Sequence, residues 1–193
     1  MHIESLISYF DNHLTLTDEE KQAVRKSFSE KRVKRRQFIL QAGEVCKLNT
    51  FVVEGCFRMY MLDHSGKEHN LQFAIENWWI GDIASFHSED PSRFYIEAIE
   101  NSIILQIKKE DQLRLFVEYP KFNRIFRVIT ENALVSYQRR VLQNISSTAA
   151  ERYIDFVNRY PDFFNRISNV QIASFLGITP EFLSTIRKKL SKS

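Results

Sequence analysis

The periodicity of the apolar residues changes once along the chain, at about Ile107, and this change separates two kinds of structure. From about Lys31 to Ile107, short runs rich in Phe, Tyr, Val and Ile alternate with turn residues, a pattern typical of strands. After Ile107 the apolar residues recur every three or four positions, which is the period of a helix. The pattern predicts a strand-built unit followed by a helical one.

Turn residues divide the first part into five strand-like segments. The segments are Gln37–Leu40, Phe51–Leu62, His69–Ile75, Phe94–Ile99 and Ser102–Ile107. Several short strands at this spacing predict a β-sandwich or jelly roll. Ahead of them, Thr17–Glu20 has the form of a capping box, which predicts a helix near the N-terminus. The basic run Arg32–Arg36 lies beside a strand-like segment, and we expect a solvated sheet edge there, because charge on an edge blocks unwanted pairing.

The second part predicts three successive helices before the C-terminal segment. These helices are Lys109–Glu118, Lys121 to about Asn144, and Thr148–Tyr160; prolines follow the first and the third. The long middle helix has apolar residues on more than one face, including Val128, Val135 and Leu142 at intervals of seven. Seven-residue spacing suits a coiled-coil seam, so we expect this helix to form a homodimer. The alternative is a helix buried within one subunit.

The segment Ser168–Leu190 has the residues that a helix-turn-helix requires at its special positions. Gly177 can adopt the left-handed conformation that ends the first helix, and Ile178 would fill the angle between the helices. Thr179 would cap the second helix, with Pro180 in its first turn, where a missing N–H costs nothing. The residues expected to face inward are Ile172, Ala173, Phe175, Leu176, Leu183, Ile186 and Leu190. The alternative is an ordinary helical hairpin with a solvated basic face.

In a helix-turn-helix the second helix enters the major groove and its N-terminal half meets base edges. Basic residues later in that helix lie near phosphates and give salt-dependent affinity. The predicted DNA-binding residues are Ser168, Asn169, Thr179, Pro180, Glu181, Phe182, Ser184, Thr185, Arg187 and Lys188. A homodimer would set two such helices about one DNA turn apart, so the predicted partner is double-stranded DNA with an inverted-repeat operator.

The whole chain resembles the Crp/Fnr family of bacterial regulators, in the branch abundant in Bacteroidetes-type bacteria. The motifs that carry the resemblance are Phe51–Tyr60, Gly66–Glu68, Trp79–Asp82 and Ile178–Ser184. The resemblance implies an α+β fold: a double-stranded β-helix (jelly roll) of the cyclic-nucleotide-binding type, a long dimerisation helix and a C-terminal helix-turn-helix. The implied domains are residues 1–120 for the sensor β-roll with flanking helices, 121–146 for the dimerisation helix and 147–193 for DNA binding.

The resemblance also implies a small-molecule effector pocket in the β-roll. The residues that it assigns to this pocket are Gly81, Asp82, Ile83, Ala84, Ser92, Arg93 and Tyr137. Relatives that bind cyclic nucleotides hold the ribose and phosphate with a Gly-Glu pair and a later Arg-Ser pair. Gly81-Asp82 matches the first pair in chemistry, whereas Ser92-Arg93 has the reverse order of the second. A one-residue shift along a strand turns a side chain to the opposite face, so we expect another effector than cyclic AMP, or none, and no required cofactor.

The second helix of the motif departs from well-known relatives, which have Arg at the positions of Pro180 and Thr185 around a shared Glu. Glu181 matches that Glu, and its carboxylate can accept a hydrogen bond from a cytosine amino group. Thr185 lacks the bidentate reach of Arg to guanine, so we expect a different target sequence. The departure keeps an alternative open: a small-molecule-binding β-roll module with a degenerate helix-turn-helix. The retained basic cluster Arg187–Lys189 favours DNA binding.

Composition argues against several other classes of protein. No stretch approaches 18 apolar residues, and the N-terminus lacks the pattern of a secretory signal, so we expect a cytoplasmic protein without a membrane partner. Two cysteines are too few for a four-thiolate iron–sulfur cluster and are expected to be ordinary thiols. The histidines lack the spacing of a cupin metal site, and no nucleophile elbow or phosphate loop is present. We therefore expect neither an enzyme nor a metal site; haem sensing and contact with RNA polymerase stay open.

Overall fold

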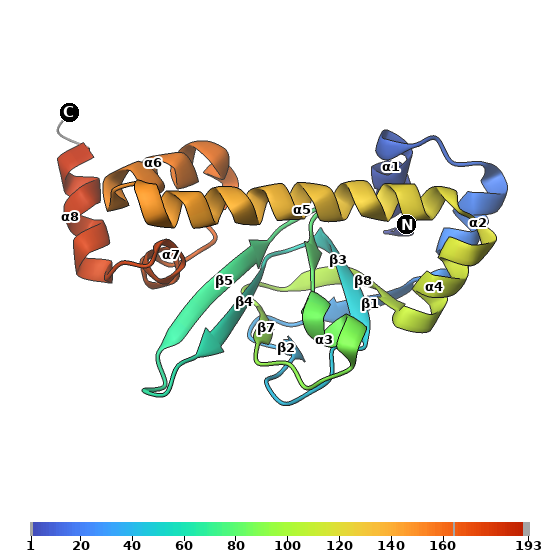
Figure 1. Ribbon diagram of the computed structural model, residues 1–193, viewed down its shortest axis with the longest axis horizontal. Coiled ribbons are helices and arrows are strands. Elements are labelled where there is room, and N and C mark those ends of the chain that lie inside the picture. The colour runs from blue at the N-terminus through green and yellow to red at the C-terminus, as the bar shows by residue number, and fades with distance from the viewer. Residues whose placement is uncertain (1, 164, 191–193) are drawn as a thin grey trace.

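The computed structural model describes residues 2–163 and 165–190, and its first large unit is a β-roll of two four-stranded antiparallel sheets (Figure 1). The strands are β1 (Ser29–Val33), β2 (Phe38–Leu40), β3 (Leu48–Glu54), β4 (Phe57–Leu62), β5 (Glu68–Ala74), β6 (Trp79–Ile80), β7 (Tyr95–Ala98) and β8 (Ser102–Lys108). One sheet has the order β1-β8-β3-β6 and the other β2-β7-β4-β5. Apolar residues of both sheets, including Val52, Phe57 and Ile96, pack between them and form the core of the roll.

The predicted strand Phe51–Leu62 is wrong as a single element, because the chain turns at Gly55 between β3 and β4. Gly55 has a φ of 107°, which favours glycine, and a Cβ at this position would lie 2.0 Å from Ser102 Oγ. The short elements β1, β6 and α3 (Ile83–Ser88) were not among the predicted segments. The basic run does follow a sheet edge, since β1 is the outermost strand of its sheet and Arg32 is exposed there.

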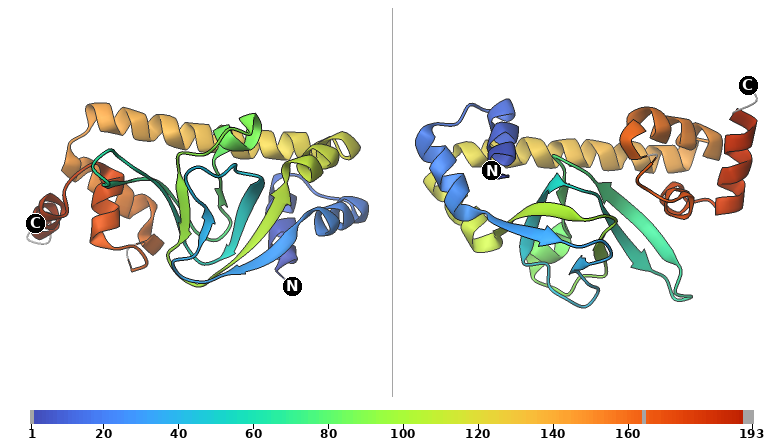
Figure 2. Two further views of the ribbon diagram at one scale, coloured as in Figure 1. Left: turned by 90° about the horizontal axis from the view of Figure 1, so that it is seen from below. Right: turned by 180° about the vertical axis from the view of Figure 1, so that it is seen from behind.

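Helices lie at both ends of the long helix α5 (Lys121–Ser146), as both views of Figure 2 show. At its N-terminal end are α1 (Ile3–His13), α2 (Asp18–Ser27) and α4 (Lys109–Glu118), and the predicted capping box of Thr17 and Glu20 starts α2. Phe10, Phe51 and Phe122 join these helices to the roll in one apolar cluster. At the other end are α6 (Ala149–Arg159), the short 3₁₀ helix η1 (Pro161–Phe163), α7 (Asn169–Leu176) and α8 (Pro180–Leu190).

The substitution Gly55→Ala tests the turn that separates β3 from β4. We expect it to lower the free energy of unfolding by about 3 kcal/mol or more, because it combines left-handed strain with a clash against Ser102. Urea unfolding measures the loss. The matched control is Gly66→Ala, where φ is 80° and nothing lies within 4 Å of the added Cβ, so we expect a loss of about 1 kcal/mol. Equal losses for the two variants would contradict a role for the Ser102 contact.

Candidate nucleic-acid interface and effector pocket

The turn between α7 and α8 has the geometry that the sequence predicted. Gly177 has a φ of 68°, its N–H donates to the carbonyls of Ala173 and Ser174, and Ile178 N–H donates to Ala173 O at 3.0 Å. These bonds satisfy carbonyls that would otherwise have no partner at the end of α7. Ala173 is fully buried, so the two helices pack closely at their crossing. The chain therefore leaves α7 and enters α8 through a tight, fully hydrogen-bonded turn.

Both helices of the motif begin with a side-chain cap. Ser168 Oγ accepts the N–H of Gln171, and the Gln171 side chain accepts the N–H of Ser168, which completes a capping box at the start of α7. Thr179 Oγ1 accepts the N–H of Phe182 at 3.2 Å, with Pro180 as the first residue of α8. Local sequence thus fixes where each helix starts.

Most of the inward-facing residues predicted for the motif are buried in one cluster. Ile172, Ala173, Leu176, Leu183 and Ile186 are buried in it, and Phe175 packs against it. Leu190 was predicted to face inward, and this was wrong: it is 40% exposed, because the last turn of α8 extends beyond α7 at the end of the molecule (Figure 1).

The predicted DNA-binding residues share one accessible surface on α8 and at the start of α7. Ser168, Asn169, Thr179, Glu181, Phe182, Ser184, Thr185 and Lys188 are exposed, and Pro180 and Arg187 are half-buried. The hydroxyls of Ser184 and Thr185 donate to carbonyls one turn earlier in α8, each at 3.0 Å. Arg187 donates to Asn169 Oδ1, which links the two helices of the motif. Phe182 is half exposed on the same surface.

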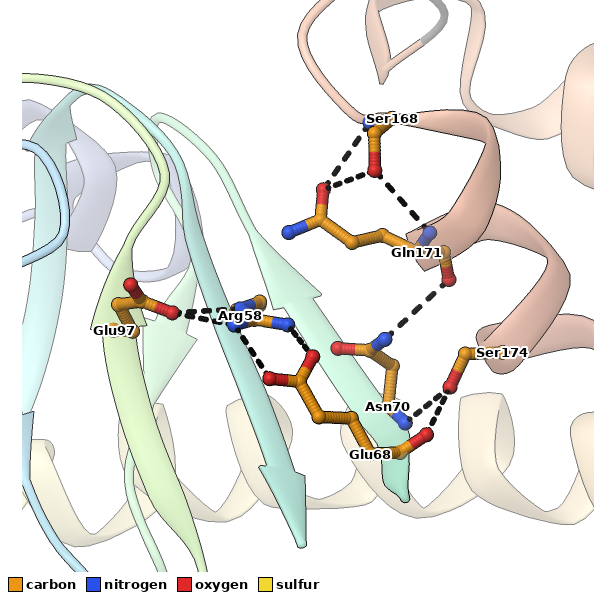
Figure 3. A network of polar contacts seen from close by, with 7 residues as sticks. All are labelled: Arg58, Glu68, Asn70, Glu97, Ser168, Gln171 and Ser174. Carbon is orange, nitrogen blue, oxygen red and sulfur yellow. Dashed lines mark hydrogen bonds and ion pairs between the residues drawn. The ribbon is translucent and has the colours of Figure 1, made fainter. Parts of the chain in front are cut away.

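Helix α7 docks on the edge strand β5, a contact that the sequence analysis missed (Figure 3). Ser174 Oγ accepts the N–H of Asn70 at 3.0 Å and donates to Glu68 O at 2.9 Å. Asn70 Nδ2 also donates to Gln171 O. Because β5 is an edge strand, its outer N–H and C=O groups are free to make these bonds. The helix-turn-helix thus completes the sheet edge of the roll.

The same strand is tied back into its own sheet by a buried arginine. Arg58 on β4 forms ion pairs with Glu68 on β5 and Glu97 on β7, and Figure 3 shows this network beside α7. The side chain of Arg58 is largely buried, so both carboxylates compensate the cost of desolvating it. Glu68 therefore uses its side chain toward the roll and its backbone carbonyl toward Ser174.

Two further arginines join the C-terminal helices to the roll. Arg166 forms ion pairs with Glu76 and Glu100, and these carboxylates raise the pKa of its guanidinium. Arg140 of α5 donates to the carbonyl oxygens of Leu71 and Asn70 on β5 and of Phe175 on α7. Its guanidinium also lies 4.0 Å from the centre of the Phe175 ring. Three parts of the chain thus meet at Arg140.

The acidic residue assigned to the effector pocket is engaged within the protein. Asp82 Oδ1 accepts the N–H of Ser85 and so caps α3, while Asp82 Oδ2 accepts the hydroxyl of Ser92 at 2.7 Å. Asp82 is only 6% exposed and Ser92 is buried with it. Both carboxylate oxygens therefore have donors, and a ribose hydroxyl would have to displace one of them.

The other residues assigned to the effector pocket do not meet at one place in this structure. Gly81 lines a cavity of about 320 Å³ inside the roll, beside Cys46. Ile83, Ala84 and Arg93 are exposed. Tyr137 lies elsewhere, on α5, where its hydroxyl donates to Gln72 Oε1 at 3.0 Å. The seven residues stay a prediction for an effector-bound form.

The two thiols belong to no cluster of candidate metal ligands within the described ranges. Cys46 and Cys56 are both buried and unbridged, and burial raises the pKa of the Cys56 thiol to about 12. Residues 2–163 and 165–190 contain no group of three or more His, Cys, Asp or Glu side chains placed to hold a metal ion. Within those ranges, no helix combines the length and apolar character needed to cross a bilayer.

Comparison with known proteins finds one matching family model and several solved structures of similar fold. Residues 30–119 match the family model of the cyclic nucleotide-binding domain. FixK2 from Bradyrhizobium japonicum superposes with a TM-score of 0.75 at 20% identity, covering 86% of this chain and 85% of that one. The c-di-GMP-responsive global regulator CLP of Xanthomonas campestris gives 0.72 at 15% identity over 91% and 92% of the chains. Catabolite Activator Protein from Thermus thermophilus gives 0.57 at 18% identity over 93% and 85%. No curated protein matches the sequence.

The fold of residues 30–119 is therefore that of the cyclic nucleotide-binding domain that they match, and the overall fold is that of Crp/Fnr-family regulators. The predicted resemblance and the α+β fold class, with a β-roll, a long helix and a C-terminal helical region, are confirmed. The structural neighbours are transcription regulators and not enzymes.

The substitution Ser174→Ala tests the docking of α7 on β5. We expect it to lower the free energy of unfolding by about 1–2 kcal/mol, because Asn70 N–H loses its acceptor and Glu68 O its donor. Hydrogen exchange should rise in α7 and β5 together. Ser184→Ala is the matched control, because the Ser184 hydroxyl bonds only within α8. This variant should lower the free energy of unfolding by less than about 0.5 kcal/mol. Unchanged exchange in β5 would contradict the docking.

Proposed function

We propose that this protein is a sequence-specific DNA-binding transcription regulator of the Crp/Fnr type that acts as a homodimer. The observation that carries the proposal is the exposed face of α8, presented by a capped and tightly turned helix pair. A helix held in this way can enter the major groove without losing its own packing, because Leu183 and Ile186 remain buried behind it.

The residues along α8 suggest how the protein would read its target. Glu181, in the first turn, would accept a hydrogen bond from a cytosine amino group, and the half-exposed Phe182 would contact a thymine methyl group. Lys188, two turns later, would lie near the phosphates and supply salt-dependent affinity. Well-known relatives have Arg at the positions of Pro180 and Thr185, and this chain does not, so its operator would differ in sequence from theirs.

A dimer is supported by an apolar stripe along α5. Leu134, Val135, Val141, Leu142 and Ile145 are between 52% and 79% exposed, and they lie in the C-terminal half of the 26-residue helix. Contiguous exposed apolar residues of this kind mark an interface, and their spacing fits a second copy of α5. The paired helices would place the two α8 helices on one side of the dimer, which suits an inverted repeat.

The effector in this proposal is a small molecule other than cyclic AMP. Asp82 is buried and caps α3, and Arg93 is exposed, so the groups that would hold a ribose phosphate are not assembled. The competing proposal, a ligand-binding module with a degenerate helix-turn-helix, rests on the missing Arg residues. Measured DNA binding separates the two.

DNA binding is tested by selecting binding sites from random duplex DNA at a fixed salt concentration. We expect an inverted-repeat motif. Glu181→Ala should change the base preference at one position in each half-site, because a single contact to a base edge is lost. Lys188→Ala should weaken binding to all sequences alike and lower the salt dependence. Glu110→Ala, an exposed carboxylate on α4, is the control. A selection that yields no motif would overturn the proposal of a sequence-specific regulator and support a ligand-binding module with a degenerate helix-turn-helix.

The dimer is tested by Val135→Glu, measured by analytical ultracentrifugation. A charge within the apolar stripe should weaken the dimer about a hundredfold or more, because desolvating an unpaired carboxylate costs several kcal/mol. The helix content should not change, since Val135 is exposed in one subunit. Val117→Glu makes the same change at an exposed position on α4 and should leave the dimer intact. Equal sedimentation of the two variants would contradict the α5 interface.

A further inference from the structure

A cavity of about 480 Å³ lies outside the roll, where the roll, α5 and the C-terminal helices meet. Its walls come from α1, β5, β6, α5, α6, η1 and α7. None of the residues assigned to the effector pocket lines it except Tyr137. Its volume falls within the range of small-molecule pockets. This cavity is therefore distinct from the cavity inside the roll.

Most of the wall is aromatic or aliphatic. Trp78, Trp79 and Phe73 line it from the roll, and Phe156 and Phe175 line it from the C-terminal helices. The Trp79 indole lies beside the Tyr9 side chain in this wall. An apolar ligand body would have close contact on several sides.

The charged residues of the wall are strongly unbalanced. Four arginines line the cavity, namely Arg139, Arg140, Arg152 and Arg159, against one carboxylate, Asp155. Asp155 is already paired with Arg159 at 2.8 Å. Among the described residues, no carboxylate lies within ion-pair distance of Arg140, which bonds only to backbone carbonyls. Arg139 and Arg140 of α5 and Arg159 of α6 line the same cavity as Tyr160.

Arg139 and Arg159 are solvent-exposed, and a surplus of positive charge beside a largely apolar wall attracts an organic anion into the cavity. We propose that this interdomain cavity binds an organic anion with an apolar body, such as a medium-chain or aromatic carboxylate. The carboxylate would lie against the arginines of α5 and α6, and the apolar body would lie against Trp78 and Trp79. Such a ligand would contact the roll, α5 and the C-terminal helices together, and so would stiffen their arrangement.

The cavity remains accessible in the proposed dimer. In a helix each residue advances by about 100°, so Ala133, Ser136 and Arg140 lie on the side of α5 opposite to Leu134, Leu142 and Ile145. The first group lines the cavity and the second forms the exposed stripe. Pairing through the stripe would therefore leave the cavity open, and the proposal does not depend on dimerisation or on DNA binding.

The chain has two tryptophans, both in the cavity wall, so their fluorescence reports its occupancy. The experiment titrates the full chain with decanoate, and in parallel with decanol, which has the same carbon chain without the charge. We expect saturable binding of decanoate with one site per chain, a rise in melting temperature, and at least about tenfold weaker binding of decanol. Decanoate is kept below the concentration at which it aggregates.

Three variants and a control locate the site and its charge dependence. Arg139→Gln should weaken decanoate binding about three- to tenfold, and Asp155→Asn should strengthen it by a similar factor, because the two changes alter the wall charge in opposite directions. Neither substitution should change the affinity for decanol, which has no charge. Ser136→Phe, at an exposed position of the wall, should fill part of the cavity and abolish the binding of both decanoate and decanol. Arg124→Gln, exposed on α5 outside the cavity, should change nothing.

Two results would overturn the proposal. One is the absence of saturable decanoate binding to a folded protein. The other is binding that Ser136→Phe leaves intact, which would place the ligand elsewhere, for example on the stripe of α5. Because the readout uses no DNA, a negative result here leaves the proposed regulator untouched, and a failure of DNA binding leaves this site untouched.

Discussion

The packing of the C-terminal helices on the β-roll is the interaction on which the rest of the structure depends. Helices α6, α7 and α8 form a unit of the size at which a chain seldom folds without outside help. Their apolar cluster is completed by Phe73 from β5 and by Cys56, the residue before β4. Phe73 contacts both Phe163 and Phe175, at ring separations of 5.9 and 5.3 Å. The helix-turn-helix is therefore stabilised by a surface that belongs to the roll.

The edge strand β5 contacts the C-terminal helices both through a side chain and through its backbone. Phe73 faces the cluster, whereas the backbone of Asn70 and Glu68 bonds to Ser174. An uncovered edge strand would invite pairing with another chain. Here α7 covers the edge, so one contact both protects the sheet and holds the helix-turn-helix.

The sequence predicted what local chemistry determines. The caps at Thr17, Ser168 and Thr179 and the turn at Gly177 depend on neighbours within a few positions, and each has the expected geometry. The docking of α7 could not be predicted, since Asn70 and Ser174 are ordinary polar residues 104 positions apart. No periodicity or motif relates such a pair, and only the packed fold brings them together.

The candidate effector residues show a second limit on what could be predicted from the sequence. The family resemblance assigned Asp82 to a ligand, yet Asp is also a preferred N-cap residue, and in the structure Asp82 caps α3. The cavity outside the roll was not predictable in the same way. Trp79, Arg140 and Asp155 come from three separate elements, and none has an unusual neighbourhood in sequence.

Helix α7 is held at both of its ends, and this bears on how a signal would reach DNA. Arg166, just before α7, is paired with Glu76 and Glu100 of the roll, and Phe175, near its end, is bonded through its carbonyl to Arg140 of α5. A helix fixed at two points cannot tilt unless one of the two anchors moves. In the proposed dimer, α5 defines the axis between the subunits, so the separation of the two α8 helices follows from how β5 sits against α5. An effector would therefore change DNA binding by shifting β5 relative to Arg140, without altering the helix-turn-helix itself.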